Sequence, residues 1–377
     1  MGTLPGRVLV DLPNWLGDLV LAMPALERLV AGNRRGETWA LAPEAHLPLL
    51  CLAGARPIAR PARSGYAWAR RRLRGQFDVV LTLRHSTRAK LLLAGTGARL
   101  RLASEGRGAA ALGLSTFAVA RSFHQRHDLD AALARLGLDA ASDRPFVLAL
   151  PSDLRRGGAR QRTLLADGAP LVALLPGSRS AAKRYPWQSY AAVARRLAGC
   201  GVAAVVVVGP GEEWLAAELG ARCGARVVPT TWPLDGTAGL LAACDAAVGN
   251  DSGLTHLAAL VGCPTLALFG PTDARRTAPV GPARVLGWRV VTPRDGRVSL
   301  DPSTVAAAVV DLAGDRIRGA ANGEPRDDVG APLGPARPAA PRLRSGDWTD
   351  EVGPIAGDTP ALAPPDRSRY HPARVGR

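Results

Sequence analysis

The first segment whose residue types could do chemistry is Pro13–Asp18, which follows a short apolar run and precedes a helical pattern from Leu19 to Val30. Ligands of open α/β sheets bind beyond the carboxyl ends of strands, where this segment would lie. Gly17 would let a ligand approach the backbone closely, with Asn14 nearby. The carboxylate of Asp18 could act as a general base that takes a proton from a hydroxyl group. The alternative is that Asp18 only caps the helix.

The second segment is 176–187, which also lies between an expected strand and an expected helix. Its small residues and hydroxyls, Ser178 among them, together with the cation Lys183, suit a phosphate site. Lysine is rare in this chain, because Lys90 and Lys183 are the only two among many arginines. Lysine supplies a compact point charge that a guanidinium does not. The spacing is not that of a Walker A loop, and a solvated basic loop is the alternative.

The third segment, 249–257, again joins an expected strand to an expected helix. The backbone N–H groups around Ser252 and Gly253 would lie at a helix N-terminus, which is a favourable site for a diphosphate. His256 falls on the same helix face and could donate to a phosphate, while Asp251 would orient the loop. Helix capping by Asp251 or Ser252 and a structural role for His256 are the alternatives.

A fourth and weaker segment is 269–272, in which Thr272 could line the same crevice, although Gly-Pro is first of all a turn signal. Metal ligands are not expected. His124 and His127 have no partner nearby at metal-binding spacing, and the five cysteines form no C-x-x-C pair. The sequence therefore predicts a site without a metal or another cofactor.

The elements that must position these segments alternate between strands and helices, which is typical of an α/β fold with parallel sheets. A chain of 377 residues suggests two domains. We expect an N-terminal domain at 1–150, a linker at 151–169, a C-terminal domain at 170–315 and a disordered tail rich in Pro, Gly and Arg at 316–377. The expected strands are 7–12, 77–83, 171–175, 202–208, 226–228, 246–248 and 265–269, and the expected helices are 19–30, 128–136, 187–198, 213–220, 237–243, 254–261 and 301–312.

The formal net charge is +16, which either reflects a coding bias toward arginine or serves an anionic partner. Between Arg60 and Arg107 the only acids are Asp78 and Glu105, so phosphates, anionic lipid or nucleic acid would be attracted there. Nucleic acid is not an expected partner, because no zinc finger or aromatic-interleaved RNA motif is present. Scattered cysteines indicate buried thiols in a reducing compartment, and the absence of a leader pattern or long apolar run favours the cytoplasm.

Three stretches together resemble glycosyltransferase family 9, the ADP-heptose:lipopolysaccharide heptosyltransferases, over roughly residues 7–312. They are LVDLPNWLGDLVLAMPAL, PGSRSAAKRYPWQSYAAVA and NDSGLTHLAALVGCPTLALFGPTD. The first is similar to the opening of the heptosyltransferase II type, the second to the nucleotide-binding loop, and the third to the signature segment of the family. The stretch 229–234 departs from the family pattern, and so does the long tail.

The resemblance implies a GT-B fold, with two Rossmann-like domains that face each other across a cleft. It implies direct, inverting transfer without a metal, from an ADP-sugar such as ADP-heptose to the inner core of lipopolysaccharide, an anionic glycolipid at the inner face of the cytoplasmic membrane. The catalytic base would be Asp18. The expected donor-binding residues are Ser178, Lys183, Glu213, Asp251, Ser252, Gly253, His256 and Thr272, and the expected acceptor-binding residues are Asn14, Gly17, Ser86, Arg88 and Lys90.

Three other hypotheses remain open at this point. The chain could be a family 9 transferase that uses another nucleotide sugar for a cell-envelope glycan. It could be a GT-B epimerase, which the three stretches disfavour. It could also be an inactive nucleotide-sugar-binding protein of envelope assembly, against which the joint presence of Asp18, Lys183 and His256 argues.

Overall fold

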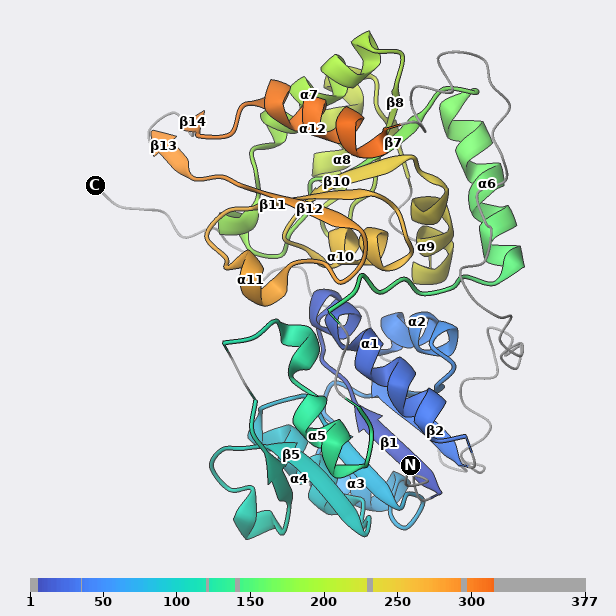
Figure 1. The fold of residues 1–377 in the computed structure, drawn as a ribbon, viewed down its shortest axis with the longest axis vertical. Helices are drawn as coiled ribbons and strands as arrows, with labels where there is room; N and C mark the ends of the chain where they lie inside the picture. Colours follow the sequence, from blue (N-terminus) through green and yellow to red (C-terminus); the bar gives the residue numbers. More distant parts are fainter. Residues whose placement is uncertain are drawn as a thin grey trace, which may run out of the picture. The chain divides into compact units, whose positions relative to one another are not determined.

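A computed structural model of the chain describes residues 6–34, 36–119, 122–139, 143–228, 233–292 and 297–314. Within these residues the chain forms two six-stranded sheets and one two-stranded ribbon (Figure 1). The predicted α/β class is confirmed. Most of the unusual stretch 229–234 and the whole of the predicted tail at 316–377 lie outside the described residues.

The first sheet has the strand order β3-β2-β1-β4-β5-β6, and every neighbouring pair is parallel. Its strands are β1 (Arg7–Asp11), β2 (Glu37–Ala42), β3 (Arg56–Ala59), β4 (Val79–Thr82), β5 (Leu100–Ser104) and β6 (Ser115–Phe117). The accompanying helices are α1 (Leu16–Gly32), α2 (Leu47–Leu52), α3 (Tyr66–Arg72), α4 (Thr87–Gly95) and α5 (Asp130–Arg135), with short 3-10 turns η1 (Glu44–His46), η2 (Ala110–Leu112) and η3 (Gln125–His127).

The second sheet has the order β12-β11-β10-β7-β8-β9 and is also parallel throughout. Its strands are β7 (Leu171–Leu175), β8 (Ala203–Val206), β9 (Arg226–Val227), β10 (Ala246–Asn250), β11 (Thr265–Phe269) and β12 (Ala283–Gly287), and β13 (Val290–Thr292) pairs with β14 (Arg297–Val298) in the ribbon. The helices are α6 (Ser152–Ala166), α7 (Trp187–Gly199), α8 (Glu213–Cys223), α9 (Leu234–Ala243), α10 (Gly253–Leu260), α11 (Ala274–Thr277) and α12 (Pro302–Ala313), with the turn η4 (Ala181–Lys183).

Both sheets reverse their strand order at one point, because the first strand in each half is followed by strands on one side and then on the other. In the first sheet this point lies between β1 and β4, and in the second it lies between β7 and β10. The loops that leave such neighbouring strands diverge, which opens a crevice for a ligand. The predicted segments 13–18, 176–187 and 249–257 all begin at these two points.

The central strands are apolar on both faces because helices cover both sides of each sheet. All five residues of β7 and all five of β11 are buried. These runs match the predicted strands 171–175 and 265–269 residue for residue. Such fully buried strands hold the loops at their carboxyl ends in fixed positions, which a catalytic site requires.

The segment predicted as a linker, 151–169, contains the helix α6, which packs on α9. The contact is close because a Cβ on Gly158 would overlap the carbonyl oxygen of Gly239. Before α6, the extended residues Phe146 and Leu148 donate backbone hydrogen bonds to Val280 and Leu260. The segment therefore packs against the second sheet, and the domain boundaries stay a prediction.

All five cysteines are free thiols. Cys244 and Cys263 are buried, but the expectation of buried thiols is wrong for Cys200, which is exposed because it lies in the surface turn after α7. Among the described residues, no helix has both the length and the apolar character needed to cross a bilayer.

The two neighbouring glycines of α6 allow a matched test of its packing. Gly158 faces the backbone of α9, whereas a Cβ on Gly157 would meet nothing within 4 Å. We expect Gly158→Ala to lower the free energy of unfolding by about 1–3 kcal/mol, because the two helices must move apart. Gly157→Ala should raise it by about 0.5–1 kcal/mol, because alanine favours the helix. Urea unfolding measures both, and equal effects of the two substitutions would contradict the packing described.

Candidate active site

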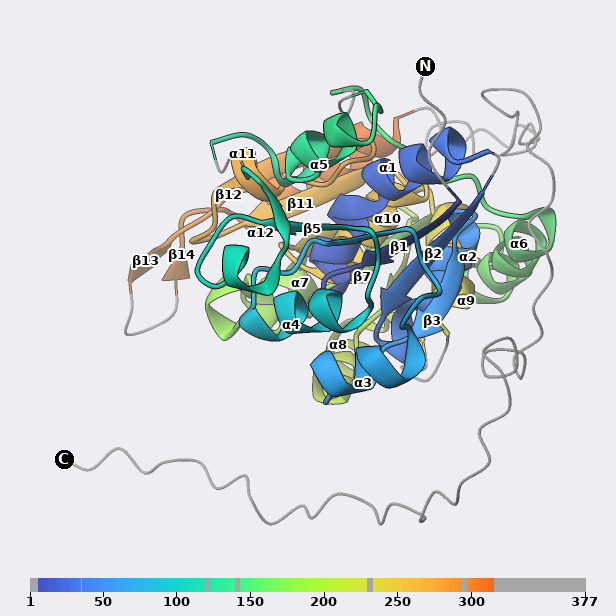
Figure 2. The ribbon, with the colours of Figure 1, turned by 90° about the horizontal axis from the view of Figure 1, so that it is seen from below.

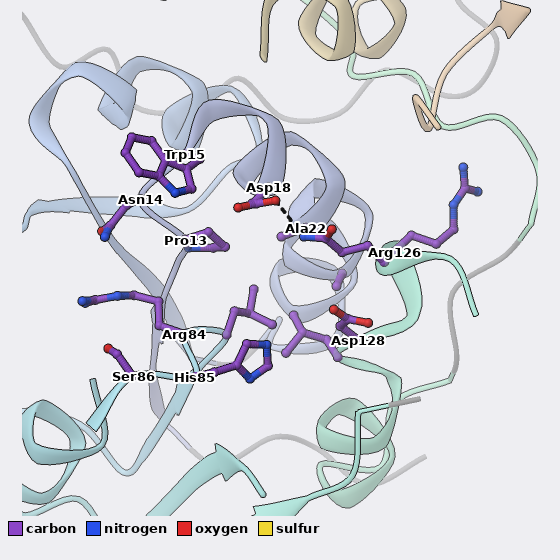
Figure 3. Close-up of a pocket in the computed structure, with 14 residues that line it drawn as sticks. Pro13, Asn14, Trp15, Asp18, Ala22, Arg84, His85, Ser86, Arg126 and Asp128 are labelled. Carbon is purple, nitrogen blue, oxygen red and sulfur yellow. Dashed lines mark hydrogen bonds between the residues drawn. The ribbon is translucent and has the colours of Figure 1, made fainter. Parts of the chain in front are cut away.

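Asp18 lies in the first turn of α1 but is not its N-cap, since that position belongs to Trp15, which makes no side-chain capping bond. The Asp18 carboxylate instead accepts a hydrogen bond from Nε2 of Gln125 at 3.0 Å (Figure 3). Simple capping is therefore not the role of this side chain.

Asp18 lines a cavity of about 250 Å³ beside the first sheet, called here the Asp18 cavity. Figure 3 shows that its wall combines the turn before α1 with the segment after β4, which contributes Arg84, His85 and Ser86. The cavity thus occupies the reversal point of the first sheet. Its lining residues are Pro13, Asn14, Trp15, Asp18, Ala22, Ala25, Leu83, Arg84, His85, Ser86, Gln125, Arg126, Asp128 and Leu129.

A buried ion cluster around Asp11 supports this cavity. Asp11 is fully buried at the end of β1 and pairs with Arg60, while Nη1 of Arg84 lies 3.4 Å from its Oδ2 atom. Thr82 donates to the same Oδ2 atom at 2.8 Å. Arg60 also donates to Oδ1 of Asn14 at 2.6 Å. A buried carboxylate is tolerated only when it is paired in this way, and the pairing fixes Asn14 and Arg84 at the cavity.

The three residues predicted as acceptor contacts after β4 have different positions. Ser86 lines the cavity and also caps α4 by accepting from the backbone N–H of Ala89 at 3.3 Å. Arg88 is exposed and donates to the carbonyl oxygen of Ala62 at 3.1 Å. Lys90 is buried and donates to the carbonyl oxygen of Arg107 at 3.4 Å. The structure brings Ser86 to the cavity, whereas Arg88 and Lys90 are not among its lining residues.

A second polar group, called here the Asp251 cluster, lies at the reversal point of the second sheet and comprises Lys183, Asp251, His256 and Thr272. Nζ of Lys183 and Oγ1 of Thr272 each lie 2.7 Å from Oδ2 of Asp251, and Nε2 of His256 lies 3.4 Å from its Oδ1. Burial would raise the pKa of Asp251, but the hydrogen bonds from His256, Lys183 and Thr272 lower it to about 2. Three residues that the sequence singled out thus surround a fourth, the buried carboxylate of Asp251.

Asn250 joins the two loops that form this cluster. Its side chain accepts from the backbone N–H of Tyr185 at 3.0 Å and from the hydroxyl of Tyr190 at 3.1 Å, and it donates to the carbonyl oxygen of Pro176 at 2.6 Å. Asn250 is fully buried. The loop after β7 is therefore tied to the end of β10, which brings Lys183 within reach of Asp251.

The start of α10 supplies backbone donors beside the cluster. Ser252 is the N-cap but makes no side-chain capping bond, and its hydroxyl lies 3.2 Å from that of Thr255. The N–H groups of a first helical turn have no partner inside the helix, so those that begin at Gly253 can serve an anion. Nδ1 of His256 is buried without a hydrogen-bond partner in the described part of the chain. The arrangement suits a diphosphate.

The Asp18 turn and the start of α10 pack directly against each other, and α1 and α10 lie side by side in both views (Figure 1, Figure 2). A Cβ on Gly17 would lie 3.3 Å from Cδ2 of His256. A Cβ on Gly253 would lie 2.7 Å from Cβ of Leu16, which is closer than real side chains approach. The two glycines therefore permit the first turn of α1, which carries Asp18, to pack against the first turn of α10, which carries the backbone donors.

An exposed contact adds to this junction. The guanidinium of Arg179 lies 3.8 Å from the ring centroid of Trp15, a residue whose side chain is half exposed. A cation over an indole ring is attracted by the ring's quadrupole. The loop after β7 thus also contacts the turn after β1.

The remaining predicted donor residues lie around Glu212, which the sequence analysis missed. Ser178 is buried, and its carbonyl oxygen accepts from Arg184 at 2.7 Å. Glu213 is exposed at the start of α8 and accepts from the backbone N–H of Gly211. Its neighbour Glu212 faces the 176–184 loop instead, because its Oε1 atom lies 3.8 Å from Nη2 of Arg184. Glu212 also accepts a hydrogen bond from the backbone N–H of Gly209 at 3.1 Å.

Among the described residues, no group of three or more His, Cys, Asp or Glu side chains could hold a metal ion. The Asp251 cluster has one carboxylate and one imidazole, and its third ionisable group is the ammonium of Lys183. A cation beside a lysine would be repelled, so this cluster suits an anionic ligand instead.

The low pKa of Asp251 makes the stability of the fold depend on pH. Its folded pKa of about 2 lies below the ordinary value of 3.8, so the stabilisation is present above pH 3.8 and is lost as the pH falls through about 2. Between about pH 5 and about pH 2, the free energy of unfolding should fall on the order of 2 kcal/mol more for the wild type than for Asp251→Asn. Urea unfolding across this range measures the difference. The control is Glu218→Gln, an exposed partner of Arg222, which should keep the wild-type pH dependence. Parallel curves for wild type and Asp251→Asn would contradict the ion cluster.

The fold is similar to solved bacterial heptosyltransferases. The structure of E. coli ADP-heptose LPS heptosyltransferase II matches with a TM-score of 0.68 and 23% identity, over 82% of this chain and 99% of that one. E. coli heptosyltransferase WaaC with ADP matches with a TM-score of 0.64 and 18% identity, over 81% of this chain and 99% of that one. The two Rossmann-like sheets therefore have the GT-B arrangement that the sequence predicted.

A relative with higher sequence identity is lipopolysaccharide heptosyltransferase 2 of Escherichia coli (strain K12), which is 38% identical over 139 residues. The aligned region is 34% of this chain and 38% of that protein, so the match spans less than half of the relative's length. The family description that matches residues 67–292 is glycosyltransferase family 9 (heptosyltransferase). This match covers more than half of the chain and includes two of the three stretches on which the resemblance rested. The chain belongs to glycosyltransferase family 9.

Proposed function

We propose that this protein transfers a heptose from ADP-heptose to the inner core of lipopolysaccharide, by a direct and inverting displacement that needs no metal. The observation that carries the proposal is the close approach of Gly17 to His256, which packs the first turn of α1, with Asp18, against the first turn of α10. Similar proteins are named as lipopolysaccharide heptosyltransferases, and one similar structure is of a heptosyltransferase with ADP.

Asp18 is the base in this proposal. The acceptor hydroxyl oxygen attacks the anomeric carbon of the donor sugar from the face opposite the diphosphate, and its proton moves to the Asp18 carboxylate. The bond between the anomeric carbon and the diphosphate oxygen breaks, the electron pair leaves with ADP, and the configuration inverts. The half-buried position of Asp18 in the wall of a cavity supports this role.

The Asp251 cluster stabilises the departing diphosphate. Lys183 supplies a positive charge, and the first-turn N–H groups at Ser252 and Gly253 add donors that are already oriented. Asp251 holds Lys183, His256 and Thr272 toward one point, so little reorganisation is needed when charge develops. Ser178 and the acids Glu212 and Glu213 would lie toward the nucleoside.

The acceptor binds in the Asp18 cavity. Its anionic groups would meet Arg84, while Asn14 and Ser86 would contact its hydroxyls, with Gly17 giving access to the backbone. Outside the cavity, exposed arginines at and around α3 and α4 would face the anionic membrane in which such a glycolipid lies, and we assign the reaction to its cytoplasmic face. These residues are Arg63, Arg70, Arg71, Arg74 and Arg88.

The first test of the proposal concerns the identity of the donor nucleotide. Isothermal calorimetry should give binding of ADP and weaker binding of UDP and GDP. Lys183→Ala should weaken ADP binding about tenfold or more, because it removes a charge-assisted hydrogen bond. Arg222→Ala, which changes an exposed arginine that pairs with Glu218 on α8, should leave the affinity unchanged. Preference for UDP or GDP would instead favour a family 9 transferase for another sugar, as the unusual 229–234 stretch allows.

The base is tested by Asp18→Asn, which keeps the shape of the side chain and removes its basicity. With ADP-heptose and a heptose-free lipopolysaccharide as acceptor, kcat should fall about 10²–10⁴-fold while the affinity for ADP stays at the wild-type value. ADP release and calorimetry on the same preparation measure the two quantities. Full turnover by this variant would exclude Asp18 as the base. A wild-type protein that binds the donor but transfers no sugar would favour an inactive binding protein.

A further inference from the structure

The hydrogen bond from Gln125 to Asp18 joins two residues that are 107 positions apart in the chain. Nε2 of Gln125 donates to Oδ1 of Asp18 at 3.0 Å, and both residues line the same cavity (Figure 3). A carboxylate on a helix can rotate about its last torsion, so a fixed donor to one oxygen sets the direction of the other. The proposed proton transfer needs only that second oxygen.

Gln125 begins η3, a turn of three residues that has few hydrogen bonds of its own. The residues 123–128, called here the Gln125 segment, are held from outside by the chain between Arg276 and Val280. Arg276 donates to both carboxylate oxygens of Asp128 at 2.7 and 2.6 Å, and also to the carbonyl oxygen of Phe123 at 2.8 Å. The two ends of the Gln125 segment are thus fixed by one guanidinium.

Two further bonds lie between these ends. Burial lowers the pKa of His124 to about 4, so its ring is neutral near pH 7. Its Nδ1 atom accepts from the backbone N–H of Arg126 at 3.1 Å, which leaves the proton on Nε2 to donate to the carbonyl oxygen of Ala278 at 2.8 Å. Arg126 donates to the carbonyl oxygen of Val280 at 3.2 Å. Directed hydrogen bonds therefore attach the Gln125 segment to residues 276–280, which belong to the second half of the chain.

The same second-half segment begins in the Asp251 cluster. Thr272 donates to Asp251 at 2.7 Å, and Arg276 follows it by four residues. The route from the proposed diphosphate site to the base consequently runs through few covalent and hydrogen bonds. It passes from Asp251 to Thr272, along the chain to Arg276, across to the Gln125 segment and on to Asp18.

We propose that Gln125 is a positioning residue that aims the Asp18 carboxylate, and that Arg276 is the clamp that fixes Gln125. This inference rests on the proposed role of Asp18 as the base. Arg276 and Asp128 suit a clamp because their side chains are only 24% and 12% exposed, and because Nη2 of Arg276 donates to both carboxylate oxygens of Asp128. The adjacent Arg275 offers a matched control, because its side chain is 91% exposed and pairs with Asp273 within its own turn.

The test is a double-mutant cycle on steady-state transfer from ADP-heptose to heptose-free lipopolysaccharide. Gln125→Ala should lower kcat about tenfold or more with the KM for ADP-heptose within twofold of wild type, because a misaimed base slows chemistry without weakening donor binding. Gln125→Glu, which keeps the size of the side chain but not its donor, should lower kcat at least as much. Arg276→Ala should lower kcat similarly, and Arg275→Ala should leave it unchanged.

The combination of Gln125→Ala with Arg276→Ala decides whether the clamp acts through Gln125. If it does, the double variant has about the kcat of Gln125→Ala alone, because the clamp has nothing left to position. Multiplied losses in kcat would overturn the inference, and so would a wild-type kcat for the two Gln125 variants. Asp128→Asn, which keeps the side-chain volume, provides a second way to open the clamp if Arg276→Ala unfolds in a thermal melt.

Asp18→Asn measured in the same assay separates this inference from the proposed function. An inactive Asp18→Asn together with fully active Gln125 variants would remove the positioning role and leave the base in place. A fully active Asp18→Asn would remove both.

Discussion

The contact on which the site depends is the head-to-head packing of the first turns of α1 and α10. Gly17 and Gly253 make it possible, because a Cβ on Gly17 would lie 3.3 Å from the His256 ring and one on Gly253 would overlap Leu16. Two helix N-termini, each with a partial positive charge, are thereby brought to one place. Such a place favours negative charge, which the Asp18 carboxylate supplies on one side and a diphosphate would supply on the other.

Each half of the site is organised by one buried carboxylate. Asp11 at the end of β1 pairs with Arg60 and Arg84 beneath the Asp18 cavity, and Asp251 after β10 holds Lys183 and the hydroxyl of Thr272. Buried anions are costly unless they are fully paired, so each one fixes the geometry of its partners. Both occur where a sheet reverses its strand order, which is where the loops diverge and a ligand can bind.

Sequence patterns predicted the parts of this structure that local residues determine. The buried runs of β7 and β11 were evident because they are continuous and apolar. The Asp251 segment was evident because a stretch containing Gly and Ser followed a strand.

Other features could not be predicted from local residues. The short strand β3 escaped prediction because its sequence, RPIA, lacks a long apolar run. The residues 151–169 were expected as a linker because of Arg-Arg-Gly-Gly, but they contain α6, in which Gly158 permits close packing on α9. Long-range pairs such as Gln125 with Asp18 and Arg276 with Asp128, 107 and 148 residues apart, left no local signal. The rarity of lysine drew attention to two residues with different environments. Lys183 pairs with Asp251, and its phosphate contact stays a prediction, whereas Lys90 is a buried side chain that donates to the carbonyl oxygen of Arg107.

The central claim is that the start of α10 and the Asp251 cluster form a diphosphate site directly opposite the Asp18 carboxylate. A crystal structure of the protein with bound ADP tests it most directly. The β-phosphate should lie within hydrogen-bond distance of the backbone N–H of Gly253 and of Nζ of Lys183. The Asp18 carboxylate should lie on the opposite side of the phosphate from these two donors. ADP bound without any contact to the Ser252–His256 turn, or bound on the side away from α1, would contradict the claim.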